Sequence, residues 1–453
     1  MGIDVLWIRT GYVHNCIMTM RIGFIVKRIT PQGFYRWLLR AYYRGIWIFD
    51  CMQSRLAQKR VDRYVAKLRK GNRPIRFGFY VIQLSTFQMK RVFDLMVTDS
   101  SFDPFVVVVP EERGNKDEAL EIMQKTYQAL YREYGDRVYL GYKDGIYHNF
   151  LERCDACSMM YPYKRIAKYE FSIECFSLHG KPVFFSPYTY YTDVVWSQEM
   201  YSLGTYKYMF KVFCANDAER EYIGKCQGMR YCKRVSVTGN PKTDGIYCSR
   251  NINKRKVILI APHHSIVPDD FVGFHIGNFL KYYKFYLSLP GRYPQIDWVL
   301  RPHPVLKLRL MQDAGWSQQE WDSYINEFSS NTNARFEDGC EYYDTFACSD
   351  AMIQDCSSFL PEYFFTGKPQ CYLLDSPNAA CGQFGEFGMK MLNLVYKAYD
   401  ESQIVSFIND IVLPGKDPMR SIRDEFAGKV LMKNHPHVSE KIVEEIKKCL
   451  NIN

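Results

Sequence analysis

The feature that most constrains this 453-residue chain is a series of short, near-continuous apolar runs, of which residues 105–109 and 257–261 are the clearest. Such runs, when prolines or charged residues bound them, are typical of strands buried on both faces of a parallel sheet. Segments with helical spacing, such as 116–134 and 316–328, lie between the runs. Strands that alternate with helices predict a doubly wound α/β architecture.

The predicted strands form two groups, with the boundary between them near residues 240–256, where a charged connector lies. The first group is 75–84, 105–109, 137–140, 156–161, 182–185 and 212–215. The pattern restarts with 235–238, which enters the turn 239–241 at the boundary, and continues with 257–261, 298–300, 351–354 and 370–373. The length and the 47% hydrophobic composition suit a globular protein with more than one core and exclude a disordered chain. We therefore predict two Rossmann-like domains that face a cleft, residues 74–240 and 241–453, after an extension of residues 1–73.

The extension holds most of the positive charge of the chain. Residues 1–73 contain 15 Lys and Arg against 3 Asp and Glu, a net charge of +12, whereas the whole chain has +10. Aromatic residues alternate with this charge between 34 and 70, which is typical of basic amphipathic helices on an anionic membrane. We therefore predict an anionic membrane surface as the partner of residues 31–73. A solvated helix packed on the next domain is the alternative, and no recognised motif supports nucleic acid.

The N-terminal sequence lacks the long apolar core and the cleavage site of a signal peptide, and no window of about 18 apolar residues predicts a membrane span. We therefore expect the 15 cysteines to be free thiols in a reducing compartment. The Cys154-x-x-Cys157 pair has no second pair at zinc-finger spacing, so we interpret it as two buried thiols.

The strongest candidate for chemistry is the stretch 349–363, in which a predicted strand ends at Asp355 and a helix begins after Ser357 and Ser358. Free backbone N–H groups at a helix start attract phosphate, and the hydroxyls add donors. Glu362 in that helix is included among the predicted donor ligands. A capped helix with no ligand remains the alternative.

Histidines follow two other strands of the second group. Leu300 is followed by Arg301-Pro302-His303-Pro304, where Arg301 suits a phosphate and His303 suits a leaving phosphate or a proton transfer. His263 and His264 follow the run 257–261 and are candidates for flanking a substrate. We predict no metal, because adjacent residues point in different directions and no third ligand is suggested.

The turn Gly239-Asn240-Pro241-Lys242 lies where the two groups of strands meet. Gly239 allows a tight turn, and Asn240 and Lys242 are predicted donor ligands near the cleft. An ordinary turn between domains is the alternative interpretation.

The loop 185–193 follows a strand of the first group and is rich in hydroxyl and aromatic residues. Such a loop suits a polyol or sugar, so Tyr188 and Tyr190 are predicted to contact the acceptor, with Asp193 as a candidate base. The alternative is an aromatic loop packed on its own domain.

Taken together and in order, these motifs resemble the CDP-glycerol glycerophosphotransferase family, the teichoic-acid primases and polymerases. The resemblance covers roughly residues 235–375. It rests on Gly239-Asn240-Pro241, Ala261-Pro262, His303-Pro304, Ser349-Asp350, Asp355-Cys356-Ser357-Ser358 and Lys368-Pro369. The family is similar to GT-B glycosyltransferases, works without a metal or other cofactor, and associates with the cytoplasmic face of the bacterial membrane.

The resemblance implies a transferase that moves glycerol phosphate or a related polyol phosphate from a CDP-activated donor to a lipid-linked glycan, as a peripheral protein in cell-envelope synthesis. The CDP diphosphate would lie over Ser357 and Ser358 and near His303, with Asp355 ordering the loop. The acceptor would approach from the first domain.

The chain departs from the family pattern in its first domain, where the Trp-His-Gly-Thr motif with the expected base is absent. His263, His264 and Asp193 therefore remain alternative bases. A GT-B glycosyltransferase or another enzyme that uses a nucleotide sugar, such as an epimerase, remains a second interpretation. A non-catalytic membrane-bound scaffold of a glycan assembly complex is a third.

Overall fold

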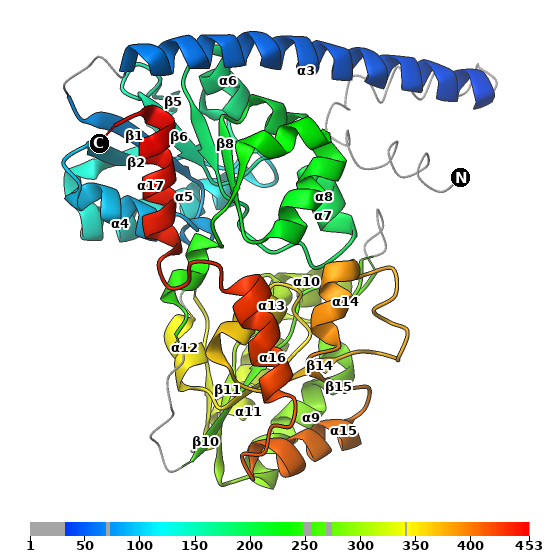
Figure 1. Ribbon diagram of the computed structural model, residues 1–453. Helices are drawn as coiled ribbons and strands as arrows, with labels where there is room; N and C mark the ends of the chain where they lie inside the picture. Colours follow the sequence, from blue (N-terminus) through cyan, green and yellow to red (C-terminus); the bar gives the residue numbers. More distant parts are fainter. Residues whose placement is uncertain (1–31, 69–72, 248–254, 269–273, 340–341, 453) are drawn as a thin grey trace.

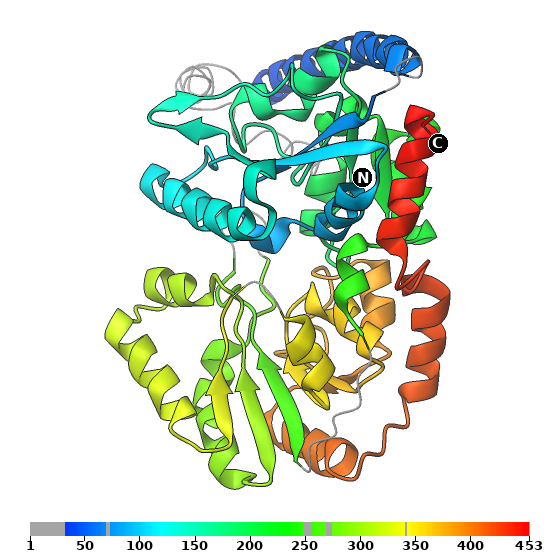
Figure 2. The same ribbon diagram turned by 90° about the vertical axis from the view of Figure 1, so that its left-hand side faces the viewer.

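The computed structural model describes residues 32–68, 73–247, 255–268, 274–339 and 342–452. Two parallel sheets, each covered by helices on both faces, are stacked one above the other (Figures 1 and 2). This arrangement confirms the predicted doubly wound α/β class. The predicted helical extension is also present, as a helix at residues 32–68.

The first sheet has the strand order β3-β2-β1-β6-β7-β8-β9, and all its pairs are parallel. Its strands are β1 (Ile75–Val81), β2 (Phe102–Val108), β3 (Val138–Leu140), β6 (Ala156–Met159), β7 (Val183–Phe185), β8 (Lys211–Cys214) and β9 (Val235–Val237). A small hairpin of β4 (Tyr142–Lys143) and β5 (Ile146–Tyr147), which the apolar pattern did not predict, lies outside it.

The apolar run in β2 has a direct structural cause. Val106 and Val108 pack into the core on one face of the sheet, whereas Phe105 and Val107 pack into the core on the other. Successive side chains of a strand point to opposite faces, so a strand covered on both sides must be apolar at every position. The covering helices are α4 (Lys90–Thr98), α5 (Lys116–Tyr134), α6 (Ile173–Leu178), α7 (Val195–Tyr201) and α8 (Asp217–Gln227).

The second sheet has the order β12-β11-β10-β13-β14-β15, again all parallel. Its strands are β10 (Lys256–Ala261), β11 (Ile296–Leu300), β12 (Ala334–Phe336), β13 (Ala351–Gln354), β14 (Gln370–Leu373) and β15 (Tyr396–Ala398). The three-residue strands β12 and β15 were not predicted. From β10 the chain moves outward to β11 and β12 and then returns to β13 on the other side of β10. The carboxyl ends of β10 and β13 therefore form the switch point of this sheet, the edge where such sheets bind ligands in a crevice.

Helices also cover both faces of the second sheet. They are α9 (Phe279–Arg292), α10 (Leu306–Asp313), α11 (Gln318–Ser329), α12 (Tyr343–Cys348), α13 (Phe359–Tyr363), α14 (Glu386–Leu392), α15 (Glu401–Ser406) and α16 (Arg420–Phe426). Within β10, Leu259 and Ile260 face different cores, which repeats the pattern of the first sheet.

The C-terminal helix α17 (Val438–Leu450) returns to the first domain (Figures 1 and 2). Its apolar face, which includes Ile442 and Ile446, belongs to the core around β1 and β2. Residues 438–450 thus pack on the first sheet, although they lie within the range 241–453 expected for the second domain. The chain therefore passes between the domains twice.

The two passages meet at the Gly239-Asn240-Pro241 turn. Gly239 has a φ of 99°, and a Cβ there would lie 2.4 Å from the carbonyl oxygen of Lys433, so only glycine fits. Asp244 accepts hydrogen bonds from the backbone N–H groups of Val438 and Ser439, at 3.0 and 2.7 Å. This turn thus fastens the start of α17, which gives it a structural role.

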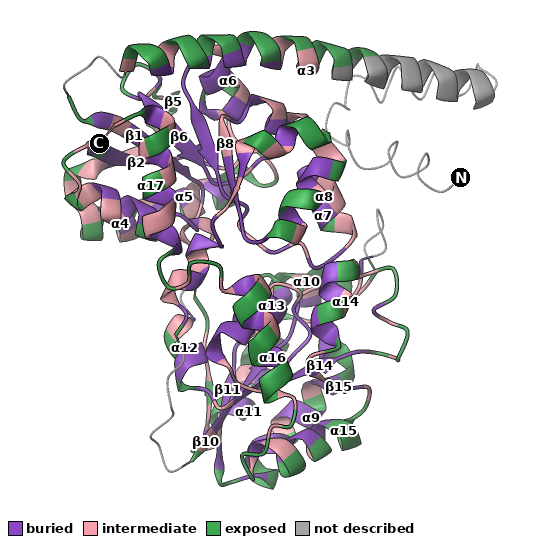
Figure 3. Ribbon diagram, viewed as in Figure 1, coloured by how far each residue is buried: buried purple, intermediate pink, exposed green. Residues whose placement is uncertain are grey.

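Helix α3 (Gln32–Leu68) lies along the outside of the first domain (Figures 1 and 3). Ala57, Val61 and Val65 are buried against the domain. On its exposed side it carries large apolar side chains, which are Ile48, Phe49, Met52 and Leu56. Among the described residues, no helix is long and apolar enough to cross a membrane.

Candidate active site

The crevice at the switch point of the second sheet is lined by the segments after β10 and β13, which carry His263, His264 and the Asp355–Ser358 turn. Asp355 joins the two segments. Its carboxylate accepts from the backbone N–H of His263 at 2.6 Å and, on its other oxygen, from the backbone N–H of Asn278. Burial raises the pKa of Asp355 to about 7, against the lowering effect of these donors. The predicted role of Asp355, ordering the loop, agrees with this geometry.

The third segment, after β11, brings His303 to the same place. The ring centroid of His264 lies 4.1 Å from the ring centroid of His263 and 4.2 Å from that of His303. The backbone also joins them, because the N–H of His303 donates to the carbonyl of Pro262 at 2.9 Å. Two of the predicted motifs therefore form one cluster, because β10 and β11 are neighbours whose carboxyl ends meet at one edge.

Backbone hydrogen bonds set the tautomers of two of the rings. The N–H of Val305 donates to Nδ1 of His303 at 3.2 Å, and the N–H of Ser265 donates to Nδ1 of His263 at 3.2 Å. A neutral imidazole whose Nδ1 accepts a hydrogen bond carries its proton on Nε2. His263 and His303 therefore each present an Nε2–H donor.

All three imidazoles are neutral at pH 7. Burial, followed by the effects of His264 and Lys242, lowers the pKa of His303 to about 3. Burial and then Arg309 lower the pKa of His264 to about 4, and burial holds the pKa of His263 well below its usual value. Nδ1 of His264 is buried without a hydrogen-bond partner among the described residues.

The three rings each offer a nitrogen within 4.8 Å of the others, which is close enough to suggest a metal site. A metal needs an unprotonated ring nitrogen, and Nδ1 of His263 and of His303 is already used as an acceptor. The remaining Nε2 atoms carry hydrogens, which suits an anion better than a cation. His303 is thus the third candidate metal ligand, which the sequence did not suggest. The tautomers of His263 and His303 nevertheless favour hydrogen bonds to oxygen over metal binding.

The predicted donor ligands beside the cluster belong to a buried network. Nζ of Lys242 lies 3.2 Å from the carboxylate of Glu362 and 5.2 Å from the centre of the Tyr342 ring. The Tyr342 hydroxyl donates to the same carboxylate. Asn240 accepts from the backbone N–H of Lys242 at 3.0 Å. Asn240 and Glu362 therefore position Lys242, which is the member with an electrostatic effect on His303.

Arg301 is bound by the segment after β12. Its guanidinium lies 3.3 Å from the carboxylate of Glu337 and donates to the carbonyl of Gly339 at 2.8 Å. The side chain is almost completely buried. These contacts give Arg301 a structural role in holding the segment after β12.

Ser357 and Ser358 lie directly before α13, as predicted. The hydroxyl of Ser358 does not cap the helix and lies 3.1 Å from Sγ of Cys356. The carbonyl of Ser357 accepts a hydrogen bond from the Thr192 hydroxyl at 3.2 Å, so the serine turn touches the loop of the first domain.

The three residues predicted in that loop have different surroundings. Asp193 is buried and accepts from the N–H groups of Trp196 and Ser197, at 2.8 and 3.3 Å, which stabilises the start of α7. Burial raises its pKa to about 6. Tyr190 is fully buried in the core that contains β10, whereas Tyr188 is partly buried. Of these three residues, only Tyr188 has intermediate exposure.

Sequence reasoning missed two residues that support the cluster. The hydroxyl of Ser265 lies 2.8 Å from Nδ1 of His263 and accepts from the N–H groups of Ile276 and Gly277. Asn278 donates to the carbonyl of Leu373 and contacts Asp355. Ser265 stands two residues after His263, which was a usable signal, whereas Asn278 lies in a segment without a motif.

Comparison with solved structures identifies proteins with the same two-domain fold. The wall teichoic acid polymerase TagF superposes with a TM-score of 0.51 at 11% identity, over 90% of this chain and 98% of that one. A TagF variant soaked with CDPG superposes with a TM-score of 0.52 at 11% identity, over 90% of this chain and 98% of that one. The UDP-GlcNAc 2-epimerase from Neisseria meningitidis bound to UDP-GlcNAc superposes with a TM-score of 0.51 at 15% identity, over 82% of this chain and 99% of that one.

These likenesses show that the chain has a GT-B fold, which confirms that part of the resemblance. No protein-family model matches the chain. No curated protein matches it in sequence.

Proposed function

We propose that this protein is a GT-B transferase that moves a polyol phosphate, such as glycerol phosphate, from a CDP-activated donor to a glycan acceptor. The observation that carries the proposal is the pair of Nε2–H donors, on His263 and His303, at the switch point of the second domain. Parallel sheets bind ligands at this edge, and imidazole donors in a partly buried site suit the oxygens of a diphosphate. The fold shared with TagF and the ordered set of motifs support the same assignment.

The donor diphosphate would lie between the histidines and the Ser357 turn. The two Nε2–H groups would donate to its oxygens. Lys242 is already paired with Glu362 and would act through that network. Asp355 would keep the two loops at a fixed separation through its contacts with His263 and Asn278.

The reaction is attack of an acceptor hydroxyl on the β-phosphorus of the donor. The new O–P bond forms as the bond from the β-phosphorus to the bridging oxygen breaks, and CMP leaves with the electron pair. We propose His264 as the base that takes the hydroxyl proton, because its Nδ1 has no hydrogen-bond partner among the described residues. A diphosphate bound beside it would raise its pKa from about 4 and make it a stronger base.

Asp193 is the less available base, although its pKa of about 6 lies above the pKa of His264, about 4. One of its carboxylate oxygens already accepts from two backbone N–H groups at the start of α7. Proton transfer to Asp193 would weaken these bonds, whereas His264 has no such contact to lose at Nδ1.

The proposal includes a peripheral position on an anionic membrane, the cytoplasmic face in a bacterial cell, with a lipid-linked acceptor. Support comes from α3, whose exposed side carries Ile48, Phe49, Met52 and Leu56 beside exposed basic residues. An exposed apolar stripe flanked by cations suits insertion at the headgroup boundary.

The test is a product assay on the purified protein with CDP-glycerol, CDP-ribitol and common UDP-, GDP- and CMP-sugars, with a crude lipid-linked glycan as acceptor. Release of CMP from a CDP-polyol, lost in His264→Asn, is the expected result. Release of UDP or GDP from a sugar donor would instead assign the site to a nucleotide-sugar enzyme. No release and no nucleotide binding would favour a non-catalytic scaffold.

A further inference from the structure

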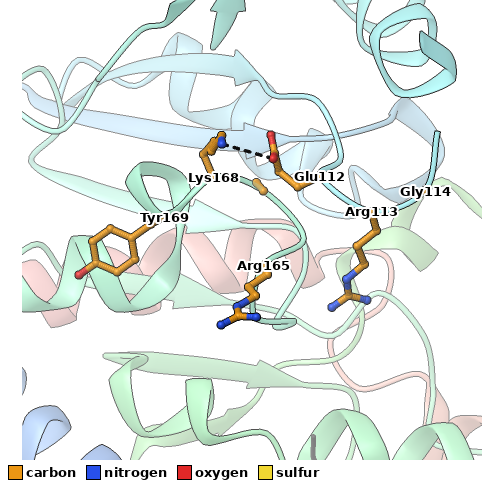
Figure 4. A pocket seen from close by; sticks show the side chains of 7 residues that line it. Glu112, Arg113, Gly114, Arg165, Lys168 and Tyr169 are labelled. Atoms are coloured by element: carbon orange, nitrogen blue, oxygen red, sulfur yellow. Dashed lines mark ion pairs between the residues drawn. The ribbon is translucent and has the colours of Figure 1, made fainter. Parts of the chain in front are cut away.

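The first domain has a second concave site, a cavity of about 480 Å³ lined by the loops after β2 and β6 (Figure 4). In this sheet the chain runs from β1 outward to β2 and β3 and returns to β6 on the other side of β1. The cavity therefore lies by the switch point of the first sheet. At the matching strands of the second sheet, β11 and β13, the loops carry His303 and the Ser357 turn. The two domains thus place corresponding loops at the corresponding edges of their sheets.

The lining of this cavity is basic. Arg113, Arg165 and Lys168 face it together with the single carboxylate of Glu112. Nζ of Lys168 lies 3.6 Å from that carboxylate, which also accepts from the Tyr147 hydroxyl. The other cations of the lining are the guanidiniums of Arg113 and Arg165. In Figure 4 they come from separate loops and extend toward the same side.

Arg113 is held in a fixed orientation. Its guanidinium donates to the carbonyl of Lys164 at 3.0 Å and lies over the ring of Tyr163, 5.3 Å from the centroid. Its Nε is buried without a hydrogen-bond partner among the described residues. Glu111, which lies near Arg113, does not line the cavity. A planar guanidinium in a fixed orientation can bind phosphate oxygens with its terminal N–H groups.

Arg165 adopts a strained backbone, with a φ of 58°. A long side chain rarely occupies this left-handed region, and such strain is found where the surroundings hold it in place for function. The next residue provides that restraint, because the carbonyl of Ile166 accepts from the N–H of Glu112 at 2.8 Å. The two loops of the cavity are thus tied together while both arginines are presented to it.

The loops of the cavity also contact the two surfaces that an acceptor would need. On one side, Nζ of Lys164 lies 3.0 Å from Asp50 of α3, the helix with the exposed apolar stripe. On the other side, the hydroxyls of Tyr163 and Tyr188 lie 3.1 Å apart. Tyr188 belongs to the loop 185–193, in which Thr192 donates to the carbonyl of Ser357. The cavity is therefore connected to both α3 and the active-site crevice.

We propose that this cavity binds a phosphate or diphosphate group and that, given the function proposed above, the group is that of the lipid-linked acceptor. The cations at Arg113 and Arg165 bind the phosphate, and the lipid runs toward α3. The glycan end then lies on the side of Tyr188 and the crevice.

The experiment is calorimetric titration of the full-length protein with inorganic pyrophosphate. We expect two sites. The double variant Arg113→Gln/Arg165→Gln should lose one of them, with at least a 10-fold weaker Kd, while His303→Ala loses the other. Arg132→Gln, an exposed arginine on α5 of the same domain, is the matched control and should bind like the wild type. The single variant Arg165→Gln removes an exposed side chain and should weaken the same site without affecting folding.

Unchanged pyrophosphate binding in the double variant would overturn the proposal. Loss in the arginine variants with no change in His303→Ala would support this cavity and contradict the donor site, so the two failures are distinguishable. A second arm measures sedimentation with phosphatidylcholine vesicles with and without phosphatidic acid. If the double variant binds vesicles with phosphatidic acid more weakly than the wild type but binds phosphatidylcholine vesicles equally, the phosphate belongs to a lipid. If the double variant loses pyrophosphate binding and its vesicle binding is unchanged, the site is supported and takes a soluble phosphate.

Discussion

At the scale of single residues, the hydrogen-bond direction at each imidazole decides what the site can bind. Val305 N–H and Ser265 N–H fix the tautomers of His303 and His263, so that both rings donate. The same rings in the opposite tautomer would suit a metal. The chemistry therefore depends on two backbone N–H groups, which no residue type in the sequence identifies.

His303→Ala should lower turnover by about 100-fold or more, because it removes one donor to the developing charge on the phosphates. His303→Gln is the matched control, since its side-chain amide can replace the Nε2–H donor and should retain more activity. Turnover is measured as CMP release, with thermal unfolding to check folding. Wild-type turnover in His303→Ala would refute the role given to this residue.

The histidine cluster also predicts a pH dependence of stability. The folded pKa of His264, about 4, lies below its unfolded value, so between roughly pH 6.5 and 4 the unfolded chain binds more protons. Stability is therefore lost as the pH falls through this window, by about 1 to 2 kcal/mol at pH 5 for His264. The measurement is denaturant unfolding of the wild type and His264→Asn at pH 7 and 5. The buried carboxyls are common to both proteins, so the variant should lose less stability, and equal losses would contradict the account.

At the scale of elements, α3 has an unusual distribution of side chains. It places Asp50, Ser54 and Gln58 toward the domain, and the carboxamide of Gln58 donates to the carbonyl of Tyr208 at 3.1 Å. The apolar residues Phe49 and Met52 remain exposed. The packed-helix interpretation accounts for one side of α3, and the proposed membrane contact would use the opposite side.

The prediction for α3 concerns vesicle binding. Replacing Phe49 and Met52 by Ser should weaken binding to vesicles that contain anionic lipid by at least 10-fold, because about 0.8 kcal/mol is lost for each CH₂ group removed from the membrane. Replacing Arg36, Arg40, Arg44 and Arg55 should weaken it as well, and high salt should reduce binding of the wild type through screening. Co-sedimentation is the measurement. Vesicle binding that is unchanged in the Phe49 and Met52 variant and unchanged at high salt would contradict the membrane position.

The sequence predicted most strands because each is buried on both faces, as Val106 and Val107 illustrate. It could not predict β12, whose three residues carry too little apolar signal. That omission had a consequence at the site. Glu337, directly after β12, forms an ion pair with Arg301, so a residue that looked available for phosphate also has a structural contact. Tyr190 was likewise predicted to contact the acceptor, because the neighbouring sequence does not show that its side chain packs into the core that contains β10.

At the scale of the whole molecule, the chain passes between the domains at Gly239 and again before α17. Both passages are joined by Asp244, which binds the first N–H groups of α17. No sequence pattern showed that the last helix packs on the first sheet, because its apolar spacing fits any core.

Asp244→Ala should destabilise the protein by about 1 to 2 kcal/mol, because two N–H groups at the start of α17 lose their acceptor. Asp244→Asn keeps one acceptor oxygen and should cost less. The free energy of unfolding by denaturant is the measurement. A loss as large in Asp244→Asn as in Asp244→Ala would point to a role other than this contact.

The central claim is that the histidine cluster binds the diphosphate of a cytidine nucleotide, and calorimetry with CDP and with cytidine tests it most directly. Charge-assisted hydrogen bonds contribute about 1.5 to 3 kcal/mol each, so two of them predict that CDP binds roughly 100-fold or more tightly than cytidine. The account predicts that this ratio falls by about 10-fold or more in His303→Ala while cytidine binding is unchanged. An equal ratio in the wild type and the variant, or no preference for CDP in the wild type, would contradict it.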